Sequence, residues 1–395
     1  MTHPPSSDAS IIDRIAPATE QAFSWRRKQL IESCKRQFPH GDSVLVADAT
    51  DIHYLTGVSE GISWLIVSEQ TTVAISRHML IREVSSIISD CEVLLPVARS
   101  TDSADLEKYV VGQLRMRSLS NPVLDPSRIS AASWLRLADA CAENRISLEA
   151  APRIVTRLRS VKDAWEMKAI RRCIEMAENS LQKLLGQGAS GWIGRSEREI
   201  AVELERIMID FGADRQGFPG TGIIVASGPN SASAHHQPGS RRIQLGDPVL
   251  IDWGAEWSGY RSDMTRTFFM RTVPDYAIAA YPMVVQAMHE AVSHLQPGKS
   301  LDAVDQAARN TIISVGYEEF HYGVGHGVGL DIHEEPWIRS HSHESFLAGM
   351  VTTIEPGIYL HGVGGIRIEN MYHLHENGAE NLCSLPISLE AMILS

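Results

Sequence analysis

The stretch PVLIDWGAEWSGYRSDMTRTFF, residues 248–269, carries two aspartates, Asp252 and Asp263, that lie eleven positions apart. The residues at both ends of this stretch are rich in strand formers, and 257–260 (WSGY) is typical of a turn. The stretch therefore predicts a β-hairpin. Antiparallel pairing of its two strands would bring the two carboxylates together.

Three further residues of metal-ligand type follow, each in a distinct local motif. His326 stands in the glycine-rich run GVGHGVG (323–329), Glu355 in TIEPG (353–357) and Glu369 in GIRIE (365–369). Segments 352–355 and 365–369 predict a second pair of strands, and the glycine-rich run predicts a loop that approaches bound metal closely. We call the five residues the ligand set: Asp252, Asp263, His326, Glu355 and Glu369.

The chemistry of the ligand set points to bound cations. Four carboxylates that converge in a folded interior repel one another and cannot all stay ionised. Two divalent ions about 3.5–4 Å apart, bridged by some of these carboxylates, would neutralise them and generate a reactive hydroxide. Any one of these acids alone is more often a solvated strand end or a helix cap. The glycine-rich run also lacks the strand-then-helix context of a nucleotide-binding loop, so it is the ordered set that indicates a two-metal hydrolase.

In order and spacing, the ligand set resembles that of the pita-bread metallopeptidases, in the branch of Xaa-Pro aminopeptidases and Xaa-Pro dipeptidases (prolidases). The resemblance runs from about Arg157 to the C-terminus and extends more weakly over the N-terminal part, through residues 51–57 (DIHYLTG). It implies an α+β pita-bread catalytic domain preceded by a smaller α/β domain of the creatinase/prolidase type. It also implies hydrolysis of the peptide bond before proline in short peptides, by a hydroxide that bridges two metals.

The resemblance assigns a role to each member of the ligand set. Asp252 would chelate one metal, and Asp263 and Glu369 would bridge both. His326 and Glu355 would complete the second metal, with Glu355 also serving as the catalytic proton acceptor. The set would hold two divalent ions per chain, with manganese as the first choice and cobalt or zinc as alternatives.

Other residues match positions that contact substrate in the family. His235 and His333 would bind substrate and stabilise the tetrahedral intermediate, and Arg367 would face the substrate or support the metal ligands. Tyr322 departs from the pattern, because relatives have a histidine there that lines the proline subsite. Asn370 also departs from it, since an aspartate often follows the last glutamate. The first departure bears on proline preference and the second on metal affinity.

Composition excludes several other classes of protein. The chain has 395 residues and a formal net charge of −12, which argues against nucleic-acid binding. No apolar run is long enough to span a membrane, and no signal peptide is visible. The five cysteines are scattered without a CxxC pair, which predicts reduced thiols and a cytoplasmic location. We expect a homodimer that acts on short peptides.

The pattern along the chain predicts a disordered N-terminus (1–15), an N-terminal α/β domain with a mixed sheet (16–156) and the catalytic domain (157–395). A helix over 20–37 is predicted to turn Arg26, Arg27 and Lys28 toward solvent. Further helices are predicted near 80–88, 105–116, 131–142, 275–295 and 301–315. Capping-box spacings at Asp163 and Ser196 predict two more helices, through about 185 and 211.

Two alternatives stay open on the same fold. One is a hydrolase of a different small amide, either creatinase-like or with its metals retained; Tyr322 keeps the second version in view. The other is a protein-interaction module without activity. The intact ligand set weighs against the module and against creatinase, which works without metal.

Overall fold

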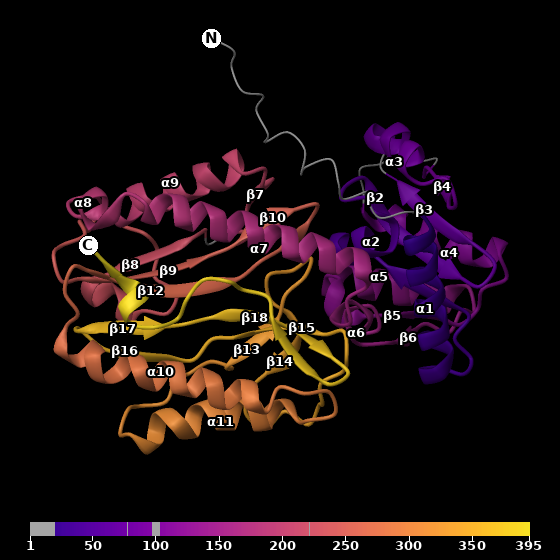
Figure 1. Cartoon of the computed structure of the whole chain (residues 1–395). Coiled ribbons are helices and arrows are strands. Elements are labelled where there is room, and N and C mark those ends of the chain that lie inside the picture. The colour runs from indigo at the N-terminus through magenta and orange to yellow at the C-terminus, as the bar shows by residue number, and fades with distance from the viewer. Residues whose placement is uncertain (1–19, 77, 97–102, 221) are drawn as a thin grey trace, which may run out of the picture. The chain divides into compact units, whose positions relative to one another are not determined.

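The computed structural model describes residues 20–76, 78–96, 103–220 and 222–395 (Figure 1). These residues form two compact units, with the division between Arg159 and Ser160, three residues past the predicted limit. The predicted disordered segment 1–15 lies outside the described residues. Among the described helices, none is long and apolar enough to cross a membrane.

The N-terminal unit is built on one six-stranded sheet in the order β4-β3-β2-β1-β5-β6. Strand β1 pairs antiparallel with β2 and parallel with β5, so the predicted mixed sheet is confirmed. The strands are β1 (Ser43–Val46), β2 (Ile62–Ser68), β3 (Thr72–Ser76), β4 (Glu92–Leu94), β5 (Pro122–Leu124) and β6 (Glu149–Ala150).

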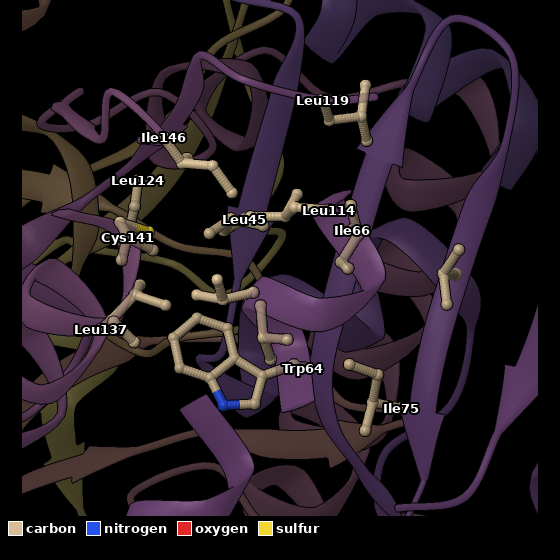
Figure 2. Packing of buried hydrophobic residues seen from close by; sticks show 14 residues of the cluster. Leu45, Trp64, Ile66, Ile75, Leu114, Leu119, Leu124, Leu137, Cys141 and Ile146 are labelled. Carbon is tan, nitrogen blue, oxygen red and sulfur yellow. The ribbon is translucent and has the colours of Figure 1, made fainter. Parts of the chain in front are cut away.

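Helices and short 3-10 turns precede, join and follow these strands. The elements are α1 (Glu20–Gln37), α2 (Ala49–Thr56), η3 (His78–Leu80), α3 (Ile81–Ile87), α4 (Ser103–Met116), η4 (Pro126–Arg128), α5 (Ala131–Glu143) and α6 (Thr156–Ser160). Figure 2 shows the apolar core between sheet and helices, where Trp64 and Leu45 of the strands meet Leu114 of α4 and Leu137 of α5. The predicted α/β pattern therefore produces a core of its own in this unit.

The prediction for the three basic residues of α1 holds for the exposed Lys28 but is wrong for the two arginines. Arg26 and Arg27 are buried, and their guanidinium groups donate to the carbonyls of Tyr54 and Leu55. These carbonyls belong to the last turn of α2, where backbone acceptors lack partners within the helix. The two arginines thus cap a neighbouring helix, a task that the periodicity of α1 alone does not reveal.

The C-terminal unit begins with two helices whose starts were predicted. Asp163 and Ser196 form capping boxes with Glu166 and Glu199 at the starts of α7 (Ala164–Leu185) and α9 (Glu197–Asp210). The remaining helical elements are α8 (Gly188–Trp192), η5 (Gly228–Ala232), α10 (Asp275–Ser293), α11 (Leu301–Ser314) and η6 (Glu390–Met392). In Figure 1, α7 and α9 lie on one side of the strands of this unit, and α10 and α11 on the other.

Two main sheets lie between these helices, in the orders β20-β12-β9-β8 and β14-β13-β15-β18-β19, with two smaller sheets, β11-β10-β7 and β16-β17. The strands of the C-terminal unit are β7 (Arg215–Gln216), β8 (Ile224–Ser227), β9 (Pro248–Trp253), β10 (Ala255–Trp257), β11 (Tyr260–Arg261), β12 (Met264–Met270), β13 (Gly325–Gly327), β14 (Glu334–Ile338), β15 (Val351–Ile354), β16 (Gly357–Leu360), β17 (Gly364–Arg367), β18 (Asn370–His375), β19 (Gly378–Asn381) and β20 (Ile393–Leu394).

Candidate metal centre

The first two members of the ligand set lie on neighbouring antiparallel strands, as predicted. Strands β9 and β12 pair with Asp252 opposite Thr265, and Asp263 immediately precedes β12. The connection between them folds into the small hairpin β10–β11 instead of a single turn. Both carboxylates therefore lie at the same end of the β9–β12 pair.

The predicted second strand pair is wrong. Strand β15, which ends just before Glu355, pairs with β18 and not with the segment that leads to Glu369. That segment, β17, instead forms a tight hairpin with β16. Ile354 pairs with Asn370, so Glu355 and Glu369 still flank one register position and remain neighbours. The two glutamates converge by a different pairing from the one expected.

The centre of the glycine-rich run, Gly325–Gly327, is a short strand, β13, and only the residues on either side of it form the predicted loop. Strand β13 lies between β14 and β15, with an irregularity in its pairing between His326 and Gly327. A Cβ atom added to Gly325 would lie 2.0 Å from the carbonyl oxygen of Thr353, and one on Gly327 would lie 2.1 Å from that of Glu335. The glycines are thus required because neighbouring strands approach too closely for any side chain.

The ligand set faces a cavity of about 410 Å³, within the range typical of small-molecule sites. The predicted substrate residues His235, His333, Arg367 and Tyr322 line the same cavity. Its other walls are formed by Phe218, Ile224, Ala234, Gln237, Gly323, Gly325, Trp337, Ile338 and Arg339. The structure therefore brings together every predicted ligand and every predicted substrate residue.

Ligand atoms of the set lie close enough to share ions. One atom from each of Asp252, Asp263 and Glu369 falls within 4.8 Å of the other two, and the same holds for His326, Glu355 and Glu369. The Nε2 atom of His326 lies 3.4 Å from Glu355 Oε1 and 3.6 Å from Asp263 Oδ2. Two overlapping groups that share Glu369 match the arrangement that a pair of metal ions requires.

The imidazole of His326 is oriented as a ligand. Its Nδ1 atom lies 3.1 Å from the carbonyl oxygen of Gly327, which accepts a hydrogen bond when Nδ1 carries the proton. That tautomer leaves the Nε2 lone pair directed at the carboxylates. Metal-ligating histidines are held in this way by hydrogen bonds from the other ring nitrogen.

The carboxylates strongly perturb one another. Burial and then the neighbouring Glu369, Asp252 and Glu355 hold the pKa of Asp263 well above its usual range. Burial and the charges of Glu355 and Asp252 do the same to the pKa of Glu369. Burial also pushes the pKa of Glu355 upward, but the hydrogen bond and charge of His326 leave it below its usual value. This excess of negative charge calls for cations.

Arg367 supplies part of the missing positive charge. Its Nη2 atom donates to Asp252 Oδ2 at 2.6 Å, and its Nε atom donates to Thr265 Oγ1 at 3.1 Å. The Thr265 hydroxyl in turn donates to Glu369 Oε2 at 2.8 Å. The other oxygen of Asp252, Oδ1, is buried and has no hydrogen-bond partner among the described residues. A buried carboxylate oxygen without a donor is costly, and a bound cation would remove that cost, so the residues present fit divalent metal ions.

The two predicted catalytic histidines lie beside the ligand set. The rings of His333 and His326 meet edge to face, with their centroids 4.3 Å apart. Desolvation and the adjacent His326 lower the pKa of His333 to about 4, so this imidazole is neutral at pH 7. One nitrogen of His333 also falls within 4.8 Å of ligand atoms of Asp263 and His326. His235 follows η5 and lines the cavity.

The two departures from the family pattern occupy different surroundings. The Tyr322 hydroxyl donates to the Glu355 carbonyl at 3.2 Å and lies 2.7 Å from the Tyr359 hydroxyl. Arg367 donates to that Tyr359 hydroxyl at 3.0 Å, which links Tyr322 to the metal centre. Asn370 instead accepts a hydrogen bond from Arg266 at 2.7 Å through its Oδ1 atom. The neutral amide is therefore satisfied by a buried arginine.

Sequence reasoning missed three supporting residues: Tyr359, Thr265 and Glu197. Glu197 Oε1 accepts hydrogen bonds from the Ser227 amide and hydroxyl and from Asn230. Glu197 Oε2 lies 2.8 Å from His236 Nε2 and accepts from the Gly239 amide. The carboxylate therefore holds both ends of the segment that carries His235. In the sequence, the position of Glu197 at the start of α9 indicates only a helix terminus and not this supporting role.

Comparison with known proteins agrees with this geometry. A model described as Metallopeptidase family M24 matches residues 168–376. An Xaa-Pro dipeptidase from Pyrococcus horikoshii is 36% identical over 230 residues, which span 58% of this chain and 64% of the relative. An Xaa-Pro dipeptidase structure from Bacillus anthracis superposes with a TM-score of 0.84 at 27% identity, over 93% of this chain and 100% of that one. An X-Pro aminopeptidase structure from Thermotoga maritima gives 0.79 at 28% identity, over 92% and 99%.

The fold and the acidic, histidine-containing cavity are those of a metallopeptidase. The chain belongs to metallopeptidase family M24. The predicted α+β pita-bread fold and the branch of Xaa-Pro peptidases are both confirmed by these matches.

Proposed function

We propose that this protein is a metal-dependent exopeptidase that hydrolyses the peptide bond before proline in short peptides. The observation that carries the proposal is the convergence of the ligand set on one cavity in which Asp252 Oδ1 lacks a hydrogen-bond donor. Relatives described as Xaa-Pro dipeptidases and an Xaa-Pro aminopeptidase support the substrate class.

In this proposal the ligand set holds two divalent ions. Asp252 would hold one ion, Asp263 and Glu369 would serve both, and His326 and Glu355 would complete the second. Ions at such a site lower the pKa of water and polarise a carbonyl group. Manganese is proposed because four carboxylates and one imidazole form an oxygen-rich set, with cobalt or zinc as alternatives.

The chain's own residues then supply proton transfer and charge stabilisation. Glu355 is ionised at neutral pH and accepts the proton that the attacking water releases. His333, which is neutral at that pH, donates a hydrogen bond to the developing oxyanion, and His235, which also lines the cavity, supplies a second donor. Arg367 holds Asp252 in position.

The size and charge of the cavity favour a short peptide with a free C-terminal carboxylate. Arg339 lines the cavity, and in the described part of the chain its guanidinium has no acidic partner. Arg339 directly follows Ile338, the last residue of β14, and lines the cavity together with Trp337. A substrate carboxylate would supply the missing countercharge.

Two further properties are proposed. The cytoplasmic location is supported by five free cysteines, four of them buried. The homodimer rests on resemblance to the family, and sedimentation of the purified protein would test it.

The proposal is tested by hydrolysis of a matched set of peptides by the protein reconstituted with Mn²⁺. The set contains an Xaa-Pro dipeptide, the same dipeptide as its amide, an Xaa-Pro-Xaa tripeptide, and that tripeptide with alanine in place of proline. Cleavage confined to the proline peptides supports the proposal, and the preferred length separates dipeptidase from aminopeptidase. A protein that holds two metals but cleaves none of them would instead act on a different amide, with Tyr322 marking the change.

A further inference from the structure

The last hairpin of the five-stranded sheet carries ligand-type side chains outside the metal centre. His373 and His375 are two positions apart on β18, so their side chains leave the same face of the strand. The register of the hairpin places Glu380 of β19 directly opposite His373. Two imidazoles and one carboxylate therefore share one face of β18–β19.

The distances among these three side chains suit a single ion. The imidazole rings of His373 and His375 have centroids 4.2 Å apart, and His375 Nε2 lies 2.9 Å from Glu380 Oε2. One ligand atom from each of the three residues falls within 4.8 Å of the other two. Ligand atoms around one tetrahedral ion are roughly 3.4 Å apart, so only small side-chain rotations separate this group from a coordinated one.

An unsatisfied atom indicates what this group lacks. Nδ1 of His373 is buried and has no hydrogen-bond partner among the described residues, which costs free energy unless something binds there. Burial, and then the charge of the adjacent His375, lower the pKa of His373 to about 4, so its lone pair is available at neutral pH. A buried, neutral and unpartnered imidazole nitrogen is suited to a metal.

The charged groups around the hairpin both help and oppose a cation. Hydrogen bonds from Arg171 and His375 lower the pKa of Glu380 to about 2, which keeps this carboxylate ionised. Arg171 Nη2 lies 2.7 Å from Glu380 Oε2, and its positive charge weakens cation binding. Both hydrogen bonds are made to Oε2, which leaves Oε1 for a metal.

We propose that His373, His375 and Glu380 form a second metal site, which binds one divalent transition ion of the zinc class. Two imidazoles and one carboxylate favour such an ion over Mg²⁺ or Ca²⁺, with water completing the coordination. Strand β18 begins at Asn370, immediately after Glu369 of the ligand set. An ion bound to the hairpin would therefore stabilise β18, the strand that follows Glu369 of the ligand set. This site does not depend on the proposed peptidase activity.

The site is tested by Zn²⁺ binding to the full chain loaded with Mn²⁺. Equilibrium dialysis against micromolar Zn²⁺, followed by elemental analysis, measures both metals separately. Zinc that replaces manganese leaves the total unchanged, whereas the proposed site raises the total by one ion per chain. His375→Asn and Glu380→Gln should each weaken this extra binding about tenfold or more. Both positions are at least partly exposed, so both variants are expected to fold.

A matched control is His289→Asn, which removes an exposed histidine from α10. This variant should keep the extra ion. The melting temperature of the wild type, but not of His375→Asn, should rise as Zn²⁺ is added to the Mn²⁺-loaded protein. A total that stays constant overturns the proposal, as does extra zinc that His375→Asn and His289→Asn retain or lose equally.

Discussion

Asp51 in the N-terminal unit and Asp263 in the C-terminal unit are equally buried, with exposed fractions of 1% and 2%. Burial raises the pKa of both. Around Asp51 the principal neighbours are Arg159, with Nη1 2.7 Å from Oδ1, and Arg128, with Nε 3.3 Å from Oδ2. Around Asp263 the principal neighbours are three more carboxylates, which raise its pKa further.

The charges of the neighbouring groups distinguish Asp51, a structural acid, from Asp263, a proposed metal ligand. Where the chain supplies its own guanidinium groups, a buried carboxylate is part of the packing, and its ion pair needs nothing from outside. Where the chain gathers several acids around the guanidinium of Arg367, we propose that bound cations supply the remaining positive charge. The sign of the neighbouring charges thus distinguishes the two, although burial alone does not.

The largest effect is expected from removal of one bridging carboxylate. Asp263→Ala should lower kcat/KM for an Xaa-Pro peptide by about 10³-fold or more, because the metals can no longer both be held. Elemental analysis of the dialysed variant should show incomplete metal occupancy. A variant that stays active with full occupancy would remove Asp263 from its proposed bridging role.

The comparison predicts opposite signs for one substitution at the two sites. In metal-free protein, Asp51→Asn should destabilise the fold by about 3–5 kcal/mol, because it leaves buried guanidinium charge without an acidic partner. Asp263→Asn should stabilise the metal-free protein by about 1 kcal/mol, because it relieves repulsion among carboxylates. Urea unfolding after chelation measures both. If both substitutions changed the free energy of unfolding in the same direction, the proposed distinction between Asp51 and Asp263 would be wrong.

A smaller effect is expected beside the ligand set. His333→Ala should retain both metals but lower kcat by about 10²-fold, as for loss of one oxyanion donor. Metal content is the internal control, because a nitrogen of His333 lies within ligand distance of Asp263 and His326. If occupancy falls along with activity, His333 is a ligand and not a hydrogen-bond donor.

Local signals in the sequence predicted the long helices but not the short helices α2, α6 and α8. The capping boxes at Asp163 and Ser196 lie where they were expected, because a cap depends on residues only three positions apart. The pairing of β9 with β12 was equally predictable from their short separation. All predicted ligands and substrate residues line one cavity. They could be predicted because each stands in a recognisable local motif.

Contacts between distant segments were the part that sequence could not supply. Pairing of 352–355 with 365–369 failed because β17 turns back on β16 and leaves β15 to pair with β18. Burial of Arg26 depends on a carbonyl of α2, which no pattern within α1 contains. The support from Thr265 likewise depends on a distant partner, because Glu369 lies 104 positions further along the chain.

Glu197 represents a third kind of buried acid and gives the smallest expected effect. Burial raises its pKa, but hydrogen bonds from Ser227, Asn230 and His236 outweigh burial and hold the pKa below the usual 4.5. Hydrogen bonds therefore outweigh burial at Glu197, whereas the charges of Arg159 and Arg128 do not outweigh burial at Asp51, whose pKa stays raised. Glu197→Gln exchanges one acceptor oxygen for a donor and should cost about 1–2 kcal/mol at pH 7.

The pH dependence of that cost identifies its origin. A carboxyl whose pKa is lower in the folded state contributes its full stabilisation above its unfolded pKa, and loses it as pH falls through the folded value. The stability difference between wild type and Glu197→Gln should therefore be constant above about pH 5 and shrink below 4.5. Urea midpoints at several pH values measure this difference. A difference that persists undiminished well below pH 4 would mean that the segment carrying His235 is held by packing, and not by an ionised acid.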